Sequence, residues 1–319
     1  MKILLVTNMF PNVDNPYYGI FIKEQMDSIC NYFPEITYDV YFIEGYKSKF
    51  AYLKSVYEIH NILNRKQYDL IHIHYGFSGL FLLKGMHKKI PVVVTLHGGD
   101  IQMAQKKWIQ VYFTKQVLKK VDYAIYLNDY MGEVINQYAK KKSKIPCAVD
   151  LNLFRPIDKK EVTDNIYKII FPSCRQRTVK NYSLFREVIS ILKNKYLLLI
   201  EEIELNHFSR IEVARLFQTA DLMLLTSYSE GSPQVIKEAM ACNLPIVSTD
   251  VGDVRFLLHN VKNTAVVETM DANLLAKCVV DVLNHQVKGI NGRDKIIQLH
   301  LDGKSIACKI RDIYESLIV

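Results

Sequence analysis

Short apolar runs alternate with longer amphipathic stretches along this chain, and that alternation constrains the fold more than any other feature. The short runs are rich in Val, Ile and Tyr and too short for buried helices, which is typical of strands inside a sheet. We predict strands at Lys2–Thr7, Tyr38–Ile43, Asp69–His74, Pro91–Leu96, Asp122–Leu127, Tyr167–Phe171, Tyr196–Glu201, Asp221–Thr226 and Pro245–Ser248. The segments between them predict helices near residues 19–33, 44–64, 78–88, 104–120, 129–141, 181–193, 209–219, 233–242, 272–285 and 293–317.

This order predicts an α/β protein built from βαβ units, with helices on both faces of parallel sheets. A length of 319 residues corresponds to two domains at roughly 150 residues each. Two prolines and a charged run between residues 145 and 160 predict a linker. We therefore expect two Rossmann-like, doubly wound domains, residues 1–157 and 158–319, that face a cleft and bind ligands at the carboxyl ends of their strands.

Several classes of protein are disfavoured by what the sequence lacks. No apolar run approaches the ~20 residues of a membrane span, and the first apolar run is too short for a secretion signal. The six cysteines are scattered without a Cys-x-x-Cys pair, which favours free thiols in a reducing cytoplasm. Neither a Gly-x-Gly-x-x-Gly turn nor a Walker-type Gly-x4-Gly-Lys-Ser loop is present, which argues against nicotinamide and ATP chemistry.

Positive charge is concentrated in the first half of the chain. Residues 1–150 hold 19 Lys and Arg against 13 Asp and Glu, which is most of the net charge of +8. A surface of this kind attracts anionic lipid, nucleic acid or an acidic substrate, or is simply solvated. The segment 44–64 suits either a helix lying at an anionic membrane surface or an ordinary helix covering the sheet, through Tyr46, Phe50, Leu53, Tyr57 and Ile62 with Lys47, Lys49 and Lys54.

The segment Ser227–Val247 carries the sharpest chemical pattern, because it predicts a strand end, a loop, a helix and a further strand. Ser232 is a good N-cap and Pro233 a good first helical residue. Glu230 then lies in the loop and Glu238 in the helix, so that two carboxylates could hold separate hydroxyl groups of one extended ligand. The helix start at Gly231, Ser232 and Pro233 presents N–H groups suited to a phosphate or sugar oxygen.

This segment resembles the signature of the group 1, or family 4, retaining glycosyltransferases, whose two Rossmann domains form the GT-B fold. Glu230-x7-Glu238 is followed, as in that family, by Ala-Met-Ala-Cys and a Pro-Ile-Val strand. Five further segments resemble family motifs in the family's order: the glycine-bearing loop 15–21, the D-h-h-H-x-H strand 69–74, the H-G-x-D turn 95–100, the I-P-N-G-V-D junction 145–150, and the R-x4-K pair Arg175 and Lys180.

The resemblance implies a role for each matching residue. Glu230 would bind hydroxyls of the donor sugar, and Glu238 the ribose hydroxyls of the nucleotide. Arg175 and Lys180 would neutralise the diphosphate as the glycosidic bond breaks, without a metal ion. Gly231, Ser232 and Pro233 would complete the donor site. From the first domain, Gly19 and His97 would face the donor, and Asp100 would lie near the acceptor hydroxyl, so that His97, Asp100 and Glu230 form the catalytic set.

The resemblance therefore predicts a retaining glycosyltransferase that needs no cofactor and no metal. The donor would be a UDP or GDP sugar and the acceptor a glycan or lipid-linked glycan in surface polysaccharide assembly, at the inner face of the membrane, with no nucleic acid partner. A non-catalytic subunit of the same fold that only binds a nucleotide sugar is the alternative. An epimerase or a phosphorylase fits less well, because phosphorylases are much longer and an inverting epimerase lacks the Glu-x7-Glu context.

Two departures from the family pattern bear on these predictions. Cys147 and Ala148 stand where the family has Asn and Gly at the domain junction. The family's glycine-rich turn between Lys180 and Asp221 is absent, which indicates a shortened nucleotide-binding side and leaves UDP versus GDP open.

The end of the chain shows helical spacing after Gly303, which we expect to interrupt the segment 293–317. We expect this terminal helix to bury Ile306, Ile310 and Ile313, to pack back on the first domain, and by joining both domains to limit their hinge motion.

Overall fold

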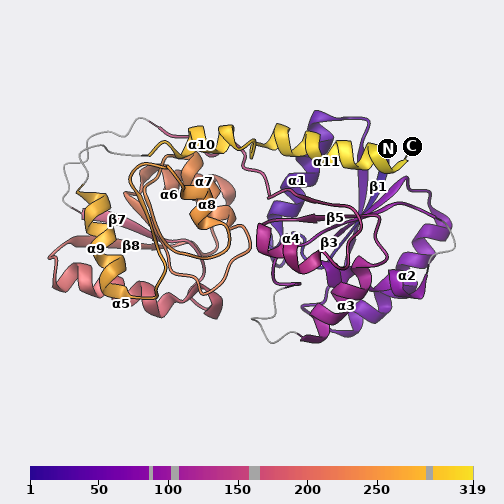
Figure 1. Cartoon of the computed structure of the whole chain (residues 1–319), viewed down its shortest axis with the longest axis horizontal. Coiled ribbons are helices and arrows are strands. Elements are labelled where there is room, and N and C mark those ends of the chain that lie inside the picture. Colours follow the sequence, from indigo (N-terminus) through magenta and orange to yellow (C-terminus); the bar gives the residue numbers. More distant parts are fainter. Residues whose placement is uncertain (86–88, 102–107, 158–165, 285–289, 319) are drawn as a thin grey trace. The chain divides into compact units, whose positions relative to one another are not determined.

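The computed structural model describes residues 1–319 except 86–88, 102–107, 158–165, 285–289 and 319 (Figure 1). The chain forms two compact units. Unit 1 comprises Met1–Ala148 together with Gly303–Val319, and unit 2 comprises Val149–Asp302. The predicted boundary after residue 157 adjoins the residues outside the description, whereas unit 2 already begins at Val149.

Unit 1 contains a parallel sheet of six strands in the order β2-β1-β3-β4-β5-β6. In chain order these are β1 (Lys2–Thr7), β2 (Thr37–Phe42), β3 (Leu70–His74), β4 (Val92–Thr95), β5 (Tyr123–Tyr126) and β6 (Lys142–Lys144). Its helices are α1 (Ile20–Tyr32), α2 (Phe50–Arg65), the 3-10 helix η1 (Gly76–Lys84), α3 (Trp108–Leu118), α4 (Asp129–Ile135) and α11 (Gly303–Ile318).

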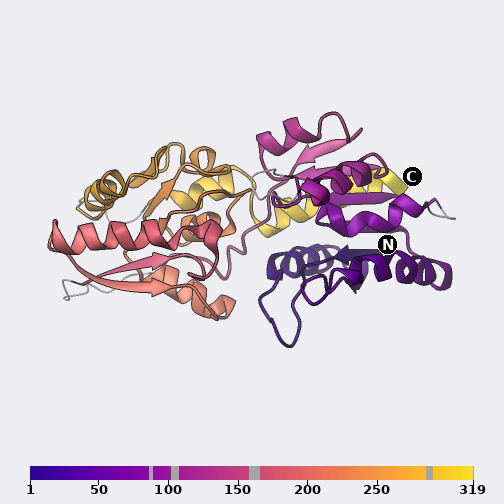
Figure 2. The same cartoon turned by 90° about the horizontal axis from the view of Figure 1, so that it is seen from below.

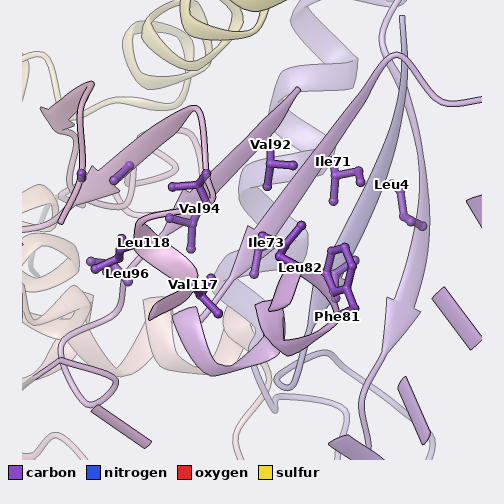
Figure 3. Close-up of a cluster of buried hydrophobic side chains, with 14 of the residues drawn as sticks. Leu4, Ile71, Ile73, Phe81, Leu82, Val92, Val94, Leu96, Val117 and Leu118 are labelled. Carbon is purple, nitrogen blue, oxygen red and sulfur yellow. The ribbon is translucent and has the colours of Figure 1, made fainter. Parts of the chain in front are cut away.

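The helices of unit 1 lie on the two faces of this sheet. In Figure 1, α1 and α11 lie above the strands, whereas α2 and α3 lie below them. Ile71 and Ile73 of β3 and Val94 of β4 pack in one cluster with Phe81 of η1 and Val117 of α3, all of them buried (Figure 3). Both β3 and β4 are buried along their whole length, as central strands of a sheet covered on both sides are.

Unit 2 contains a parallel sheet of five strands in the order β11-β10-β9-β7-β8. Its elements are β7 (Ile166–Phe171), η3 (Thr178–Lys180), α5 (Tyr182–Asn194), β8 (Leu199–Glu204), α6 (Arg210–Thr219), β9 (Leu222–Leu225), α7 (Gln234–Ala241), β10 (Ile246–Thr249), α8 (Val254–Leu258), β11 (Thr264–Val267), α9 (Ala272–Leu283) and α10 (Gly292–Gln298). Helices α5 and α9 pack side by side and share one buried cluster with β7 and β9 (Figures 1 and 2).

The predicted fold class is confirmed, because both units are parallel α/β sheets and every predicted strand is present. The predicted start of β8 was wrong by three residues. Leu197 adopts a left-handed conformation (φ 55°), and the amide of Leu198 donates to the carbonyl of Leu192. Residues 196–198 therefore form a turn after α5 instead of opening the strand. The strands β6 and β11 and the helix α8 were not predicted.

Several predicted helices have different bounds. The segment predicted as a helix near 78–88 is a 3-10 helix that ends at Lys84, with 86–88 outside the description. The parts of the predicted helices that fall on 104–107 and 285 are likewise outside it. The helix predicted from residue 44 begins at Phe50, and α4 ends at Ile135. The segment 293–317 is two helices, and Gly303 opens the second of them instead of interrupting one.

The terminal helix α11 belongs to unit 1, where it packs against α1. Ile306, Ile310 and Ile313 are buried, as predicted, and Tyr314 is fully buried beside them. All six cysteines are free thiols, which is also as predicted. None of the described helices combines the length and the apolar composition that crossing a bilayer requires.

Candidate functional site

The two sheets share one strand order, which marks the same edge of each as a ligand-binding position. In each sheet the first strand of the unit, β1 or β7, lies between the second and the third strands. The connections that follow the first and third strands therefore leave in opposite directions, and a crevice opens between them at the carboxyl ends. In unit 2 these connections carry Lys180, after β7, and Glu230, after β9.

Lys180 and Glu230 form an ion pair at this position. The Nζ of Lys180 lies 2.6 Å from Oε1 of Glu230, and the two side chains are only 9% and 13% exposed. The hydroxyl of Ser227 donates to the same carboxylate oxygen at 2.6 Å. The structure thus brings together two of the predicted donor-binding residues, 50 positions apart in the chain, in a nearly dry setting.

The loops that hold this pair are tied to each other. The hydroxyl of Thr226 donates to the carbonyl oxygens of Lys180 and Asn181 at 3.2 and 3.1 Å. The amide of Tyr228 donates to the carbonyl of Val179 at 2.9 Å. These bonds join the end of β9 to η3, so the ion pair is positioned by backbone as well as by charge.

The start of α7 differs slightly from the prediction. The helix begins at Gln234 with Pro233 as its N-cap, so the prediction of Ser232 as N-cap was wrong by one residue. The buried hydroxyl of Ser232 has no hydrogen-bond partner among the described residues. Gly252 (φ 61°) lies against this loop, since a Cβ there would meet the carbonyl oxygen of Gly231 at 2.4 Å. Only glycine allows that close approach.

Glu238 forms a second ion pair, with a different cation. It lies inside α7 with 1% of its side chain exposed, and Nη2 of Arg210 donates to its Oε1 at 2.6 Å. The guanidinium of Arg210 also lies over the ring of Phe154, at 4.8 Å from the centroid. Glu238, the residue predicted to bind ribose, is therefore held in place by Arg210 of α6, which is itself stacked on Phe154. The sequence pattern indicated neither of these contacts.

Arg175 does not join Lys180 in the structure. Its Nε lies 3.3 Å from Oε2 of Glu204 at the end of β8, and its side chain is exposed. The backbone amide of Arg175 donates to the other oxygen of Glu204 at 2.9 Å. The predicted basic pair is thus one nearly buried lysine and one exposed arginine that β8 holds in place.

In unit 1, Gly19 closes the long connection that follows β1. It caps α1 in the left-handed conformation (φ 68°), and a Cβ there would meet the backbone of Met9 at 2.5 Å. The position needs glycine because the first and last parts of this connection touch there. Gly19 therefore shapes the loop at the carboxyl end of β1.

His97 and Asp100 follow β4 and depend on each other. The carboxylate of Asp100 is buried and accepts the backbone N–H groups of His97 at 3.1 Å and of Gly76 at 3.0 Å. Burial raises the pKa of Asp100 to about 6, although these N–H groups oppose the shift. The carboxylate of Asp100, which is predicted to lie near an acceptor, holds the turn that carries His97.

Three histidines gather at the carboxyl ends of β3 and β4. His74 Nδ1 and His97 Nε2 share a hydrogen bond of 3.0 Å, and their rings stack. His72 shares hydrogen bonds with Thr95 at 2.8 Å and with the Tyr314 hydroxyl of α11 at 2.6 Å. Burial lowers the pKa of His72 and of His97 to about 3, and holds the pKa of His74 well below its usual range. All three rings are neutral at pH 7.

Sequence reasoning missed Ser227, Arg210 and Gly252. Two of these had a signal, because Ser227 directly follows a strand and Gly252 comes shortly after the next one. Arg210 had none, since it reaches Glu238 from 28 residues away. Within the part of the chain that the structure describes, no group of three or more His, Cys, Asp or Glu side chains could hold a metal ion.

Comparison with protein families shows two matches that together span most of the chain. Residues 30–153 match the model described as Glycosyltransferase Family 4, and residues 186–285 match the model described as Glycosyl transferases group 1. An uncharacterized glycosyltransferase of Methanocaldococcus jannaschii is 24% identical over 99% of both chains. The UDP-Gal:alpha-D-GlcNAc-diphosphoundecaprenol alpha-1,3-galactosyltransferase of Escherichia coli is 22% identical over 84% of this chain and 80% of its own.

Solved structures show the same architecture at low sequence identity. Sucrose-phosphate synthase from Thermosynechococcus elongatus superposes with a TM-score of 0.76 and 18% identity, over 99% of this chain and 98% of that one. HepE from Anabaena, solved in complex with UDP-glucose, superposes with a TM-score of 0.71 and 14% identity, over 99% and 100%. These likenesses show a fold of the GT-B type.

Proposed function

Because this chain belongs to the group 1, or family 4, glycosyltransferases, we propose that it transfers a sugar from a nucleoside diphosphate sugar to a hydroxyl of a glycan or lipid-linked glycan. The transfer retains the anomeric configuration and uses no metal ion. The observation that carries this proposal is the nearly buried pair of Lys180 and Glu230 at the carboxyl end of the unit 2 sheet.

Glu230 and Lys180 divide the work at the donor. The carboxylate of Glu230 accepts hydrogen bonds from hydroxyl groups of the sugar, and Ser227 and Lys180 fix its orientation beforehand. The ammonium of Lys180 has three donor hydrogens, so it can contact a phosphate oxygen while it still holds Glu230. Its charge then stabilises the leaving diphosphate in a setting that excludes most water. Arg175 adds positive charge at the exposed side.

The remaining donor contacts come from α7. Glu238 binds the ribose hydroxyls from inside the helix, where Arg210 holds its carboxylate. The helix start at Gly231, Ser232 and Pro233 supplies N–H groups for a phosphate or sugar oxygen. The hydroxyl of Ser232, which has no partner among the described residues, is a further donor for this oxygen.

In unit 1 the neutral ring of His97 is the sugar-binding group, and Gly19 lets the loop after β1 approach the donor. A neutral imidazole offers one N–H or one lone pair, which suits a sugar hydroxyl better than a phosphate. Asp100 acts through His97, because its buried carboxylate accepts the N–H of that residue. We propose this positioning role in place of direct contact with the acceptor.

UDP is the proposed nucleotide, and a lipid-linked glycan the proposed acceptor. HepE was solved in complex with UDP-glucose, and the name of the Escherichia coli relative gives a UDP-sugar donor and a diphosphoundecaprenol-linked acceptor. An acceptor of that kind places the reaction at the membrane and in surface polysaccharide assembly. The shortened connection before α6 is compatible with this choice.

The test is a screen of UDP and GDP sugars, with EDTA present throughout. We expect slow release of UDP from one sugar nucleotide, faster release with a diphosphoundecaprenol-linked glycan, and an anomeric proton in the product that shows retention by NMR. Glu230→Gln should remove this activity. The control is Glu201→Gln, which should keep it, because the exposed carboxylate of Glu201 on β8 pairs with Lys168 on β7.

Two outcomes would contradict parts of the proposal. Donor binding without release or transfer under any acceptor would identify a non-catalytic subunit that only binds nucleotide sugars. Activity that is absent in EDTA and appears when an excess of Mn²⁺ is added would contradict the role given to Lys180 and Arg175.

A further inference from the structure

Unit 1 exposes large apolar side chains along α2 and α3. Their exposed fractions range from 50% at Ile109 to 77% at Phe50. On α2 they are Phe50, Leu53 and Tyr57, and on α3 they are Trp108, Ile109 and Tyr112. The opposite sides of both helices enter the core of the unit, through residues such as Ile59 and Val117. The exposed row is therefore not the side that the fold itself buries.

Both helices lie on the same face of the sheet and turn these residues away from it. Each packs against η1, and in Figure 1 both lie below the strands. A chain of ring contacts joins them, from Tyr52 of α2 to Phe77 of η1 at 4.6 Å, then to Phe113 of α3 at 6.2 Å and to Tyr112 at 5.4 Å. The connecting rings Tyr52, Phe77 and Phe113 are half-buried, so one aromatic cluster links the two exposed rows.

This surface is strongly basic. The segments 49–66, 76–85 and 108–120 contain a single acidic residue, Glu58, which pairs with Lys54 and with the hydroxyl of Tyr41. The ammonium of Lys84 lies over the ring of Tyr57 at 4.4 Å. The cations of these segments are Lys49, Lys54, Arg65, Lys66, Lys84, Lys115, Lys119 and Lys120.

We propose that this aromatic and basic surface of α2, η1 and α3 docks on an anionic lipid bilayer. Trp and Tyr rings bury their apolar bodies at the level of the lipid headgroups, and Lys stems lie along the surface with their ammonium groups at the phosphates. Each Lys or Arg adds attraction to an anionic leaflet that falls off within a Debye length. The contact is peripheral, and it uses side chains that the fold leaves exposed.

The charge favours a bilayer over a second copy of the chain. Two copies that met through this surface would bring cations against cations, because these segments hold eight basic residues and one carboxylate. Of the eight, Lys54 is paired with Glu58 and Lys66 with Asp39. An anionic bilayer complements the charge and accepts the aromatic rings. The inference adds to the proposed function, since a lipid-linked acceptor lies in the same bilayer, but vesicle binding needs neither donor nor acceptor. If the docking proposal fails, the proposed sugar transfer therefore still stands, and the reverse also holds.

Trp108 is the only tryptophan of the chain, so its fluorescence reports on this surface alone. With vesicles of phosphatidylcholine and phosphatidylglycerol we expect a blue shift and protection from acrylamide, and with phosphatidylcholine alone we expect neither. Raising the salt from 0.1 to 0.5 M should weaken binding about tenfold, because the attraction is screened.

Sedimentation with the same vesicles identifies the residues. The pair Ile109→Ser and Tyr112→Ser should lower the partition coefficient about tenfold, and the pair Lys115→Gln and Lys119→Gln should remove most of its dependence on anionic lipid. The matched pair Leu274→Ser and Ile297→Ser, which are exposed positions on unit 2 helices, should change nothing. Circular dichroism verifies that each variant is folded.

Three results would overturn the proposal: equal binding to neutral and anionic vesicles, binding that the α3 variants do not weaken, or an unshifted Trp108 spectrum on sedimented vesicles. Self-association in the ultracentrifuge that the same variants abolish would assign the surface to a second copy instead. If either double variant is unfolded, Tyr112→Ser alone and the salt dependence of the wild type provide the same decision.

Discussion

The two units share a strand order but place opposite chemistry at the carboxyl ends of their sheets. In unit 2 the polar groups are charged, with Lys180 against Glu230 and Arg210 against Glu238. In unit 1 the corresponding position holds His72, His74 and His97, whose neutral rings bond to each other, to Thr95 and to Tyr314. One topology therefore supports a charged site and an uncharged one.

The difference shows how each unit keeps polar groups away from water. A largely buried carboxylate needs a cation, as Glu230 and Glu238 have, or backbone N–H donors, as Asp100 has. Losing the cation of a buried pair costs far more than the pair contributes. A buried imidazole needs only hydrogen bonds, because it can remain neutral. Unit 2 should therefore be sensitive to the loss of a charge, and unit 1 to a fall in pH.

The largest effect should follow the loss of the Lys180 cation. Lys180→Met leaves the carboxylate of Glu230 without its cation, which we expect to destabilise unit 2 by about 3–5 kcal/mol in urea unfolding. Arg175→Met is the matched control, because its pair with Glu204 is exposed and should contribute less than about 1 kcal/mol. The double variant Lys180→Met with Glu230→Gln should recover stability but not turnover. Equal losses in the two single variants would remove the contrast between them.

Lowering the pH should destabilise unit 1 more than unit 2. The native pKa values of His72 and His97 are about 3, against an ordinary value of 6.5, so between these values the unfolded chain binds protons that the native chain does not. The free energy of unfolding therefore falls as the pH falls below 6.5. Asp100 acts in the opposite direction between its native pKa of about 6 and its ordinary value of 3.8. The net loss at pH 5 should be roughly 3 kcal/mol.

Hydrogen exchange at pH 7 and pH 5, corrected for the intrinsic rate, measures this difference for each unit. Amides of β3 and β4 should lose protection relative to those of β9 and β10. His72→Gln should reduce the effect, whereas His259→Gln, at an exposed position, should leave it unchanged. Equal losses of protection in both units would show that the buried histidines do not govern the response.

The two carboxylates of unit 2 should separate in kinetics. If each carboxylate accepts a hydrogen bond from a donor hydroxyl, replacement by glutamine should weaken binding of the donor or of the transition state by about 1.5–3 kcal/mol. Glu230→Gln should lower kcat, because the sugar that it holds changes shape in the transition state, whereas Glu238→Gln should mainly raise KM for the donor. Unchanged kinetics in both folded variants would refute their assignment to the donor site.

The fold could be predicted almost completely, because period and composition are local signals. The strands β1 and β4 are mainly runs of Val, Ile and Leu, as strands of a covered parallel sheet are. The predictions that failed concern segments whose residues carry no local signal of their structure. The strand β6 reads Lys-Ser-Lys and has no apolar signal, since it pairs only at the edge of its sheet. Leu197 takes a left-handed turn that its side chain does not indicate.

The candidate site was predictable only where residues lie close in sequence or match a motif. Glu230, Gly231 and Ser232 were found in that way, and the family resemblance assigned Lys180 to the same donor site, but the ion pair of Lys180 with Glu230 was not predicted. Arg210 and Tyr314 could not be found, because each reaches its partner across a distance in sequence that only packing closes. Asp100 was found as a residue, but its hydrogen bonds to the backbone N–H groups of Gly76 and His97 could not be read from the sequence.

The smallest effect tests whether α11 supports the histidines of unit 1. The hydroxyl of Tyr314 is fully buried and shares a hydrogen bond of 2.6 Å with His72. Tyr314→Phe keeps the ring but leaves Nδ1 of His72 without that partner, which we expect to cost about 1–2 kcal/mol in urea unfolding. Tyr130→Phe, at an exposed position of α4, should change nothing. Because the contacts of Tyr314 with His72 and Met26 lie within unit 1, KM for the donor should stay within about twofold. The turnover number kcat should fall only if His97 moves with His72. A variant as stable as the wild type would mean that α11 holds unit 1 through Ile306, Ile310 and Ile313 alone.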